Sequence, residues 1–177
     1  MEKILGMIKF ILLKLFSMGK IKTNGIRNYI GAGSKIVVKN KSKIEFGAKT
    51  WISDYCALVS TGKGLVIGEN CYFNSNVRIF SMDQISIGDN CLFGPNIVIV
   101  DHNHKYDDVE QYICKQGYKT APVVIGNNIW FGANTVITKG VTISDNIVVG
   151  AGSVITRDLL TPGVYVGNPA IKIKELR

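Results

Sequence analysis

Histidine is scarce in this chain of 177 residues, which contains only His102 and His104. Cysteine is scarce as well: there are four, and none of them forms a Cys-x-x-Cys pair. Structural zinc needs clustered cysteines and histidines, and the three-histidine sites of catalytic zinc need more histidine than this chain offers. We therefore expect no metal site.

The four cysteines, Cys56, Cys71, Cys91 and Cys114, show no spacing typical of a disulfide framework. Buried, unpaired cysteines behave as small apolar residues. Free thiols are typical of a reducing compartment, so the sequence predicts a cytoplasmic protein.

The chain has no long uninterrupted apolar run. Its most apolar segment, residues 1–20, is broken by Lys9 and Lys14, which makes it too short and too charged to span a bilayer. No small-residue cleavage site follows, so it is a poor signal peptide. The segment predicts an amphipathic helix, which either caps the domain or packs between subunits, or else lies on the inner membrane face. Its predicted apolar face consists of Ile4, Leu5, Ile8, Ile11, Leu12, Leu15 and Phe16.

What the sequence does contain is a period of six. An apolar row runs through Ile125, Phe131, Ile137, Ile143, Val149 and Ile155, and a second row of apolar or small residues runs through Val123, Ile129, Thr135, Val141, Ile147 and Ser153. This period fits neither an α-helix nor a single half-buried strand. It predicts a triangular parallel β-solenoid, in which three six-residue sides make one coil.

The same period returns upstream with small shifts of phase. Stacked coils should align two inward columns, one of Ile52, Phe73, Phe93, Phe131 and Val149, the other of Phe46, Ile67, Ile87, Ile125 and Ile143. Asparagine and glycine recur between the rows, for example at Gly68 to Asn70 and Gly88 to Asn90, and both residue types favour tight corners.

These observations predict an all-β fold, a left-handed parallel β-helix of about six coils with an N-terminal amphipathic helix and a long loop at 101–122. We divide the chain into the helix (1–22), the β-helix (23–160) and a C-terminal tail (161–177). A charged fraction of only 19% suits such a solenoid.

The net charge of +8 calls for an anionic partner. Lysine and arginine are scattered and accompany no nucleic-acid recognition motif, so nucleic acid is not the expected partner. The phosphates of a nucleotide cofactor or an anionic membrane surface explain the charge more economically.

The loop at 101–122 is the one long interruption of the coils, and such interruptions are usually functional. It contains both histidines of the chain. A histidine near neutral pKa is suited to act as a general base on an acceptor hydroxyl.

Several segments of the sequence resemble the hexapeptide-repeat acyltransferases, above all the branch of maltose and galactoside acetyltransferases and polysaccharide O-acetyltransferases. The resemblance rests on Gly94 to Ile99 followed by His104, on Pro122 to Asn134, on Gly150 to Thr156, and on the terminal Gly167 to Ala170. It covers roughly residues 28–174.

The resemblance implies an acetyl-CoA-dependent O-acetyltransferase that acts on a sugar hydroxyl, in surface polysaccharide biosynthesis, as a homotrimer with sites between subunits. An amino-sugar N-acetyltransferase or a xenobiotic acetyltransferase of the same fold stays open. His104 matches the catalytic base and His102 is the second candidate. Asn74 matches an asparagine that contacts the acceptor, and Asp83, Asp101 and Tyr106 are further candidates for acceptor binding.

The acetyl-CoA groove is implied by a second set of matches: Trp130, Gly132, Ala133, Gly150, Ala151, Thr156, Arg157, Pro169, Lys172 and Lys174. Three departures stand out. Ala133 replaces a hydroxyl residue found in some relatives, and Ile171 occupies a position that is often basic. The extra N-terminal domain of the maltose and galactoside enzymes is replaced by the cationic helix, which favours acceptors handled at the membrane.

Two other classes fit less well. A γ-class carbonic anhydrase shares this prism but binds zinc through three histidines per site, which two histidines per chain cannot supply. A non-catalytic solenoid, such as an ice-binding protein, would show a flat repetitive threonine face and would need no loop at 101–122.

Overall fold

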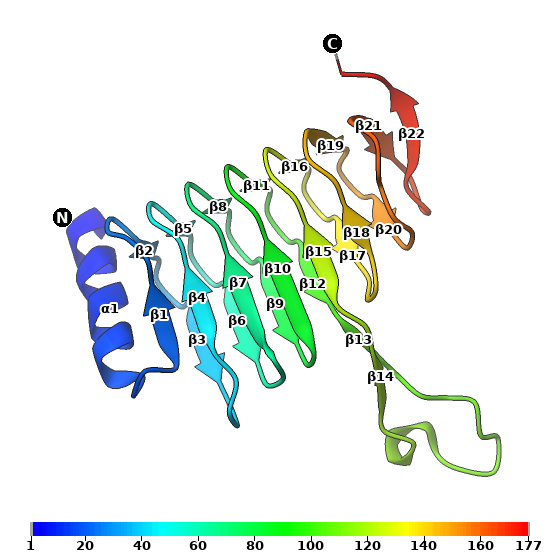
Figure 1. Ribbon diagram of the computed structural model, residues 1–177, viewed down its shortest axis with the longest axis horizontal. Coiled ribbons are helices and arrows are strands. Elements are labelled where there is room, and N and C mark those ends of the chain that lie inside the picture. The colour runs from blue at the N-terminus through cyan, green and yellow to red at the C-terminus, as the bar shows by residue number, and fades with distance from the viewer. Residues whose placement is uncertain (1, 177) are drawn as a thin grey trace.

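The computed structural model describes residues 2–176. Short parallel strands wind into a three-sided prism, with a helix across one end and a hairpin that projects from the side (Figure 1). The fold is mostly β, with about six coils and one N-terminal helix, as the sequence predicts for a left-handed β-helix.

Each side of the prism is one sheet. The first sheet contains β1 (Ile21–Thr23), β4 (Ile44–Phe46), β7 (Gly64–Ile67), β10 (Gln84–Ile87), β15 (Val123–Ile125) and β18 (Thr142–Ile143). The second contains β2 (Tyr29–Ile30), β5 (Trp51–Ile52), β8 (Tyr72–Phe73), β11 (Leu92–Phe93), β16 (Trp130–Phe131), β19 (Ile147–Val149), β21 (Gly163–Val166) and β22 (Ile171–Lys174). The third contains β3 (Lys35–Val38), β6 (Ala57–Ser60), β9 (Arg78–Ser81), β12 (Val98–Val100), β17 (Val136–Ile137) and β20 (Val154–Ile155).

The predicted inward columns are confirmed by the strand register. Phe73 pairs with Phe93, and Phe93 pairs with Phe131, so the three rings stack inside the prism with centroids 4.5 Å and 5.0 Å apart. Phe46, Ile67 and Ile87 align in the first sheet in the same way. All of these side chains are buried. Burial of each such side chain contributes roughly 1.5–3 kcal/mol, so the columns are the main source of stability.

The corners follow from asparagine. Asn70, Asn90, Asn128 and Asn146 all have φ between 55° and 60°, a left-handed conformation that asparagine tolerates better than most residues. Their side chains also bond across coils: the amide nitrogen of Asn70 donates to Oδ1 of Asn90 over 2.8 Å. Repeated corners of this kind keep successive coils in register.

The helix α1 (Glu2–Phe16) covers the open end of the first coil. Phe10 is buried and packs edge-on against Phe46, with ring centroids 5.1 Å apart. Gly6 faces the ring of Tyr29, and a Cβ at that position would collide with it. Lys9 donates from Nζ to the carbonyl oxygen of Gly31 over 2.9 Å. The helix therefore caps the solenoid, which was one of the two roles predicted for it.

The face that caps is not the face that the sequence pattern indicates. Gly6, Phe10 and, in part, Leu13 contact the solenoid, whereas the predicted apolar face is exposed along its whole length. The helix is apolar on two sides, so the pattern alone could not show which side packs.

Two ends of the prism depart from simple coiling. Strand β1 begins at Ile21, inside the segment assigned to the helix. At the other end β21 pairs in parallel with β19, and β22 then folds back antiparallel onto β21. The second sheet thus continues into the C-terminal tail.

Among residues 2–176 no helix is long and apolar enough to cross a membrane.

Candidate active site

The sequence predicts a long loop at 101–122, but this insertion contains regular structure. It contains the antiparallel strands β13 (His102–His104) and β14 (Tyr118–Thr120), with the short 3-10 helix η1 (Ile113–Lys115) between them. The hairpin leaves the prism at the corner between the third and first sheets and extends away from it (Figure 1). A polar segment can keep its backbone paired in this way without a core of its own.

Asp101 anchors the base of this hairpin. Its side chain is buried, and its carboxylate accepts hydrogen bonds from the backbone N–H groups of Met82 and Asp83, both over 2.8 Å, and from the hydroxyl of Ser81 over 3.1 Å. These three donors belong to the corner of the preceding coil. Asp101 therefore ties the start of the hairpin to the solid part of the prism.

Both histidines lie on one face of the hairpin, because alternate residues of a strand point the same way. Nδ1 of His102 lies 3.2 Å from Oδ1 of Asp101. His104 is exposed and pairs across the hairpin with Tyr118. The Tyr118 ring lies 4.5 Å from the His104 ring and 5.6 Å from the His102 ring, measured between centroids. Tyr118 thus contacts both candidate bases.

Tyr118 was not identified as a site residue from the sequence. Its place in the long loop gave one signal, but only the strand pairing shows that it faces the histidines. The pairing could be anticipated in part, because His102 to His104 and Tyr118 to Thr120 lie at the two ends of the insertion.

Asn74 and the groove candidates on the second-sheet side lie at a different edge of the prism. Asn74 follows β8, at the corner between the second and third sheets, and its Oδ1 accepts a hydrogen bond from the N–H of Ser75 over 2.7 Å. Gly132 and Gly150 follow β16 and β19 at the same corner, in higher coils. Trp130 points outward from the second sheet beside this corner, with 53% of its surface exposed.

This corner presents a bare strip of backbone. Ala133 and Ala151 carry only a methyl group, and the glycines are required by close stacking: a Cβ on Gly132 would lie 2.5 Å from the nitrogen of Ala151. An extended ligand can therefore approach the backbone closely here.

The remaining groove candidates lie near the C-terminal end of the prism. Thr156 and Arg157 follow β20 and are exposed. Pro169 sits in the turn between β21 and β22, and Lys174 is exposed. Nζ of Lys172 donates to Glu175 over 2.7 Å and to Oγ1 of Thr161 over 3.1 Å. Within residues 2–176, Arg157 and Lys174 form no ion pair, unlike Lys172.

Two candidates for acceptor binding have other contacts in the single chain. Asp83 forms an ion pair with Lys63, with the charged atoms 2.8 Å apart. Asp101 is fully enclosed, as described above. Tyr106 is exposed on the hairpin just beyond His104.

The structure therefore divides the predicted site into two halves. His102, His104 and Tyr106 belong to the hairpin at one corner, while Asn74, Gly132 and Gly150 belong to another, at the opposite end of the third-sheet strands. The fold of one chain does not bring the two halves together.

The thiols offer no accessible nucleophile inside the prism. Cys56, Cys71 and Cys91 are buried, and Cys114 is exposed on the hairpin. Burial raises the pKa of the Cys56 thiol. Its hydrogen bond with Cys71, together with burial, raises the pKa of the Cys91 thiol. Within residues 2–176 no group of three or more His, Cys, Asp or Glu side chains is placed to hold a metal ion.

Comparison with known proteins supports the same family that the sequence resembles. The family model described as hexapeptide repeat of succinyl-transferase matches residues 84–100 and 122–157. The galactoside O-acetyltransferase of Escherichia coli (strain K12) is 37% identical over 131 residues, which are 73% of this chain and 63% of that protein.

Two solved structures share the fold over most of the chain. A maltose O-acetyltransferase from Clostridium difficile 630 is 32% identical, with a TM-score of 0.59 over 84% of this chain and 69% of that chain. A galactoside acetyltransferase in complex with coenzyme A is 28% identical. Its TM-score is 0.67 over 96% of this chain and 70% of that chain. The chain spans 58% of the length of several curated relatives that it matches. Coils, corners and these similarities together show that the chain belongs to the hexapeptide-repeat acyltransferase family.

Proposed function

We propose that this protein is an acetyl-CoA-dependent O-acetyltransferase that acetylates a sugar hydroxyl during biosynthesis of a surface polysaccharide such as a capsule or O-antigen. Membership of the family supports the reaction class, and the maltose and galactoside acetyltransferases among the relatives support a sugar acceptor. The observation that carries the proposal is the placement of both histidines on one face of the hairpin, beside Tyr118.

In this proposal His104 is the general base. Its exposed imidazole removes the proton of the acceptor hydroxyl as the oxygen becomes a nucleophile. Acetyl-CoA supplies the activated acyl group. The acceptor oxygen attacks its thioester carbonyl, the C–S bond breaks, and coenzyme A leaves as the thiolate, which takes up the proton held by His104. Asn74 orients the acceptor, and the backbone N–H of Ala133 is the donor available at its position to stabilise negative charge on the carbonyl oxygen.

His102 and Asp101 have a supporting role. The carboxylate of Asp101 fixes the base of the hairpin and lies against Nδ1 of His102, so it orients this imidazole. His102 is the alternative base, since a histidine held by a carboxylate is a common arrangement in general-base catalysis. We assign Asp101 to positioning, because its oxygen atoms are already occupied.

The residues of the bare corner fit an extended thioester cofactor. Trp130 supplies an exposed apolar surface, and Gly132, Ala133, Gly150 and Ala151 leave the backbone accessible to the pantetheine arm. The nucleotide phosphates are proposed to bind near the C-terminal end of the prism, where Thr156 and Arg157 follow β20 and Lys174 is exposed, because cations there offset the phosphate charge. Pro169 shapes the adjoining turn. Lys172 could bind a phosphate only after breaking its ion pair with Glu175.

Transfer is proposed to be direct, without an acyl-enzyme. Three thiols are buried, and the pKa values of Cys56 and Cys91 are raised, which disfavours the nucleophilic thiolate. Free thiols also suit a cytoplasmic location.

We further propose a homotrimer in which each site lies between two subunits. The support is the separation of Asn74 from His104 by the length of the third-sheet strands in one chain. A neighbouring subunit that presents its hairpin to this corner would complete the site. Heterologous contacts of this kind close into rings.

The proposal is tested by a turnover screen. Purified protein is given acetyl-CoA with neutral sugars, amino sugars and polysaccharide repeat units, while thiol release and product mass are followed. An acetyl ester on a sugar hydroxyl is the expected product. Acetylation of amino groups alone, or no transfer to any saccharide, would contradict the proposed function.

A further inference from the structure

The helix α1 leaves a second apolar face uncovered. Gly6 and Phe10 face the solenoid, whereas seven large apolar side chains of the helix are exposed. The exposed fraction is 70% for Leu15 and 81% for Phe16. They are Ile4, Leu5, Ile8, Ile11, Leu12, Leu15 and Phe16, here called the outer face. A helix that is apolar on all sides is normally buried, and exposed patches of this kind usually mark an interaction site.

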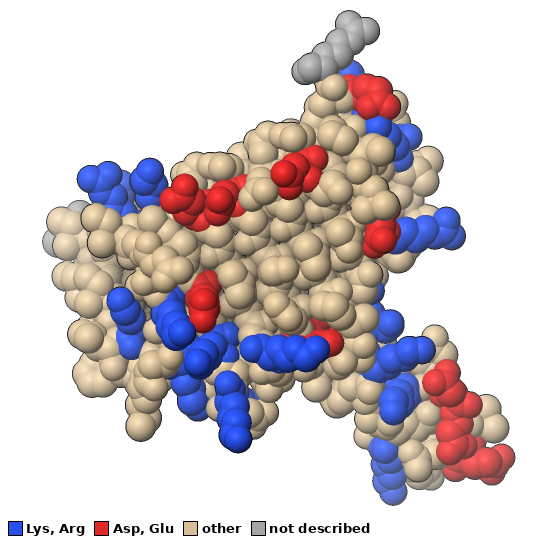
Figure 2. Space-filling view, viewed as in Figure 1, with Lys and Arg blue, Asp and Glu red and all other residues tan. Residues whose placement is uncertain are grey.

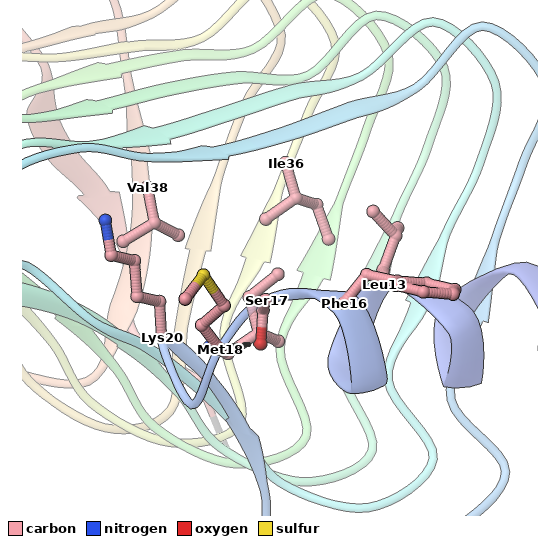
Figure 3. Close-up of a pocket in the computed structure, with 8 residues that line it drawn as sticks. Leu13, Phe16, Ser17, Met18, Lys20, Ile36 and Val38 are labelled. Carbon is pink, nitrogen blue, oxygen red and sulfur yellow. Dashed lines mark hydrogen bonds between the residues drawn. The ribbon is translucent and has the colours of Figure 1, made fainter.

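The apolar surface continues beyond the end of the helix. A groove of about 340 Å³ lies between the end of α1 and strand β3. Figure 3 shows Phe16 and Met18 on one side of this groove and Ile36 and Val38 on the other, with the Lys20 ammonium group near its edge. Helix and groove together form one apolar surface at this end of the prism.

The charge of the protein is concentrated at the same end. Residues 1–49 contain 11 lysine and arginine residues against 2 glutamates, whereas residues 50–177 contain 10 basic and 11 acidic residues. The segment 1–49 therefore carries a formal charge of +9, and the remainder carries −1. Figure 2 shows lysine and arginine side chains gathered near the end of the prism that α1 covers.

Little of this charge is neutralised within the chain. In this segment Glu45 forms an exposed ion pair with Lys22, with Oε1 of Glu45 3.5 Å from Nζ of Lys22. Lys3 and Lys14 are exposed on the helix, between the capping face and the outer face. Lysines at the border of an apolar face can extend toward charged headgroups while their carbon chains stay on the apolar surface.

We propose that the outer face and the basic residues around it dock on an anionic phospholipid membrane, with α1 lying in the interface. The chemistry fits on both counts: the apolar side chains enter the acyl boundary, and the ammonium groups meet the lipid phosphates. A second copy of the chain fits poorly, because two ends with a formal charge of +9 would face each other. Docking through this end sets the prism upright on the membrane, with the hairpin and its histidines held away from the lipid.

The test is co-sedimentation of the full chain with vesicles. Equal parts of phosphatidylglycerol and phosphatidylcholine should retain the protein at low ionic strength, and pure phosphatidylcholine should retain far less. Binding to the anionic vesicles should weaken sharply at about 1 M salt, where the screening length falls to about 3 Å.

Matched variants separate the two contributions. Leu12→Glu combined with Leu15→Glu should reduce partitioning at least about tenfold. Lys3→Gln and Lys14→Gln should reduce it about fivefold each, and only at low salt. The control is Val109→Glu with Ile113→Glu, which changes two exposed apolar residues on the hairpin and should leave partitioning unchanged. All of these positions are exposed, so melting temperatures should not change.

The result does not depend on the proposed reaction, since no turnover is measured. Failure of wild-type protein to bind anionic vesicles at low salt would overturn the proposal. The proposal would also be overturned if the Leu12→Glu, Leu15→Glu variant bound anionic vesicles as well as the wild-type protein. A smaller assembly for that variant in light scattering would show instead that a second copy covers the outer face.

Discussion

Oδ1 of Asp101 lies 3.2 Å from Nδ1 of His102, and the same carboxylate accepts hydrogen bonds from the backbone N–H groups of Met82 and Asp83. One buried acid therefore joins a corner of the solenoid to the hairpin that carries both histidines. The rigid prism and the chemistry-bearing insertion are linked through this residue.

Replacing Asp101 by Ala should destabilise the protein. The N–H groups of Met82 and Asp83 would lose their acceptor inside the structure, and hydrogen bonds to a charged group contribute about 1.5–3 kcal/mol each. We expect the free energy of unfolding in urea to fall by about 2–5 kcal/mol. Asp107→Ala, on the exposed hairpin, is the control and should be neutral. Unchanged stability of the Asp101 variant would contradict the anchoring role.

Replacing His104 by Ala should lower the rate of transfer by about two to four orders of magnitude, because a general base contributes roughly that much. Binding of coenzyme A and the melting profile should stay close to wild type, since the imidazole is exposed. His102→Ala is the comparison and should cost less. Full activity of the His104 variant together with an inactive His102 variant would transfer the role of base to His102.

The capping function of α1 can be measured by two phenylalanine variants on one helix. Phe10 is 3% exposed and packs on Phe46, so Phe10→Ala should cost about 3–5 kcal/mol of stability. Phe16 is 81% exposed, so Phe16→Ala should change stability by less than about 0.5 kcal/mol. Thermal or urea unfolding of both variants decides the point. Equal effects would mean that the helix does not pack as described.

Thiol labelling should distinguish the four cysteines. Cys114 is exposed and should react quickly with a thiol reagent in the native protein. Cys56, Cys71 and Cys91 are buried, and the pKa values of Cys56 and Cys91 are raised, so these two stay protonated as the pH passes the ordinary thiol range. One thiol should therefore react at pH 9 before unfolding and four after it. Rapid native labelling of the Cys114→Ala variant would contradict this.

The repeat made the solenoid predictable. Ile125, Phe131 and Ile137 recur every six residues, and this spacing determines which side chains face inward and which coils align. Asparagine at the corners adds an independent signal, because Asn70 and Asn90 adopt the left-handed conformation that few residues tolerate. Local preference and long-range pattern agree, so the columns could be listed residue by residue.

Three features were beyond the sequence pattern. The helix is apolar on two sides, and the small size of Gly6 against Tyr29 decides which side packs. Asp101 is a charged residue at the start of a loop, where exposure is the ordinary expectation, yet neighbouring backbone N–H groups make burial favourable. The pairing of His104 with Tyr118 depends on a hairpin whose alternating residues gave no strong strand signal.

The division of the site between two corners leads to a test of the assembly. His104 lies on the hairpin and Asn74 on a corner at the far end of the third-sheet strands, so we expect each site to use His104 of one subunit and Asn74 of the next. His104→Ala and Asn74→Ala should both be nearly inactive when prepared alone. Light scattering should show a homotrimer for each.

Mixed assemblies of these two variants should regain activity. When the two chains are unfolded together in equal amounts and refolded, a given site receives an intact His104 and an intact Asn74 in about one case in four, if subunits close randomly into rings. Activity of about one quarter of the wild-type value is therefore expected. Mixing the two folded variants without unfolding is the control and should restore little. If the site were contained in a single chain, no mixed assembly could combine the intact residues, and the refolded mixture would be as inactive as its components.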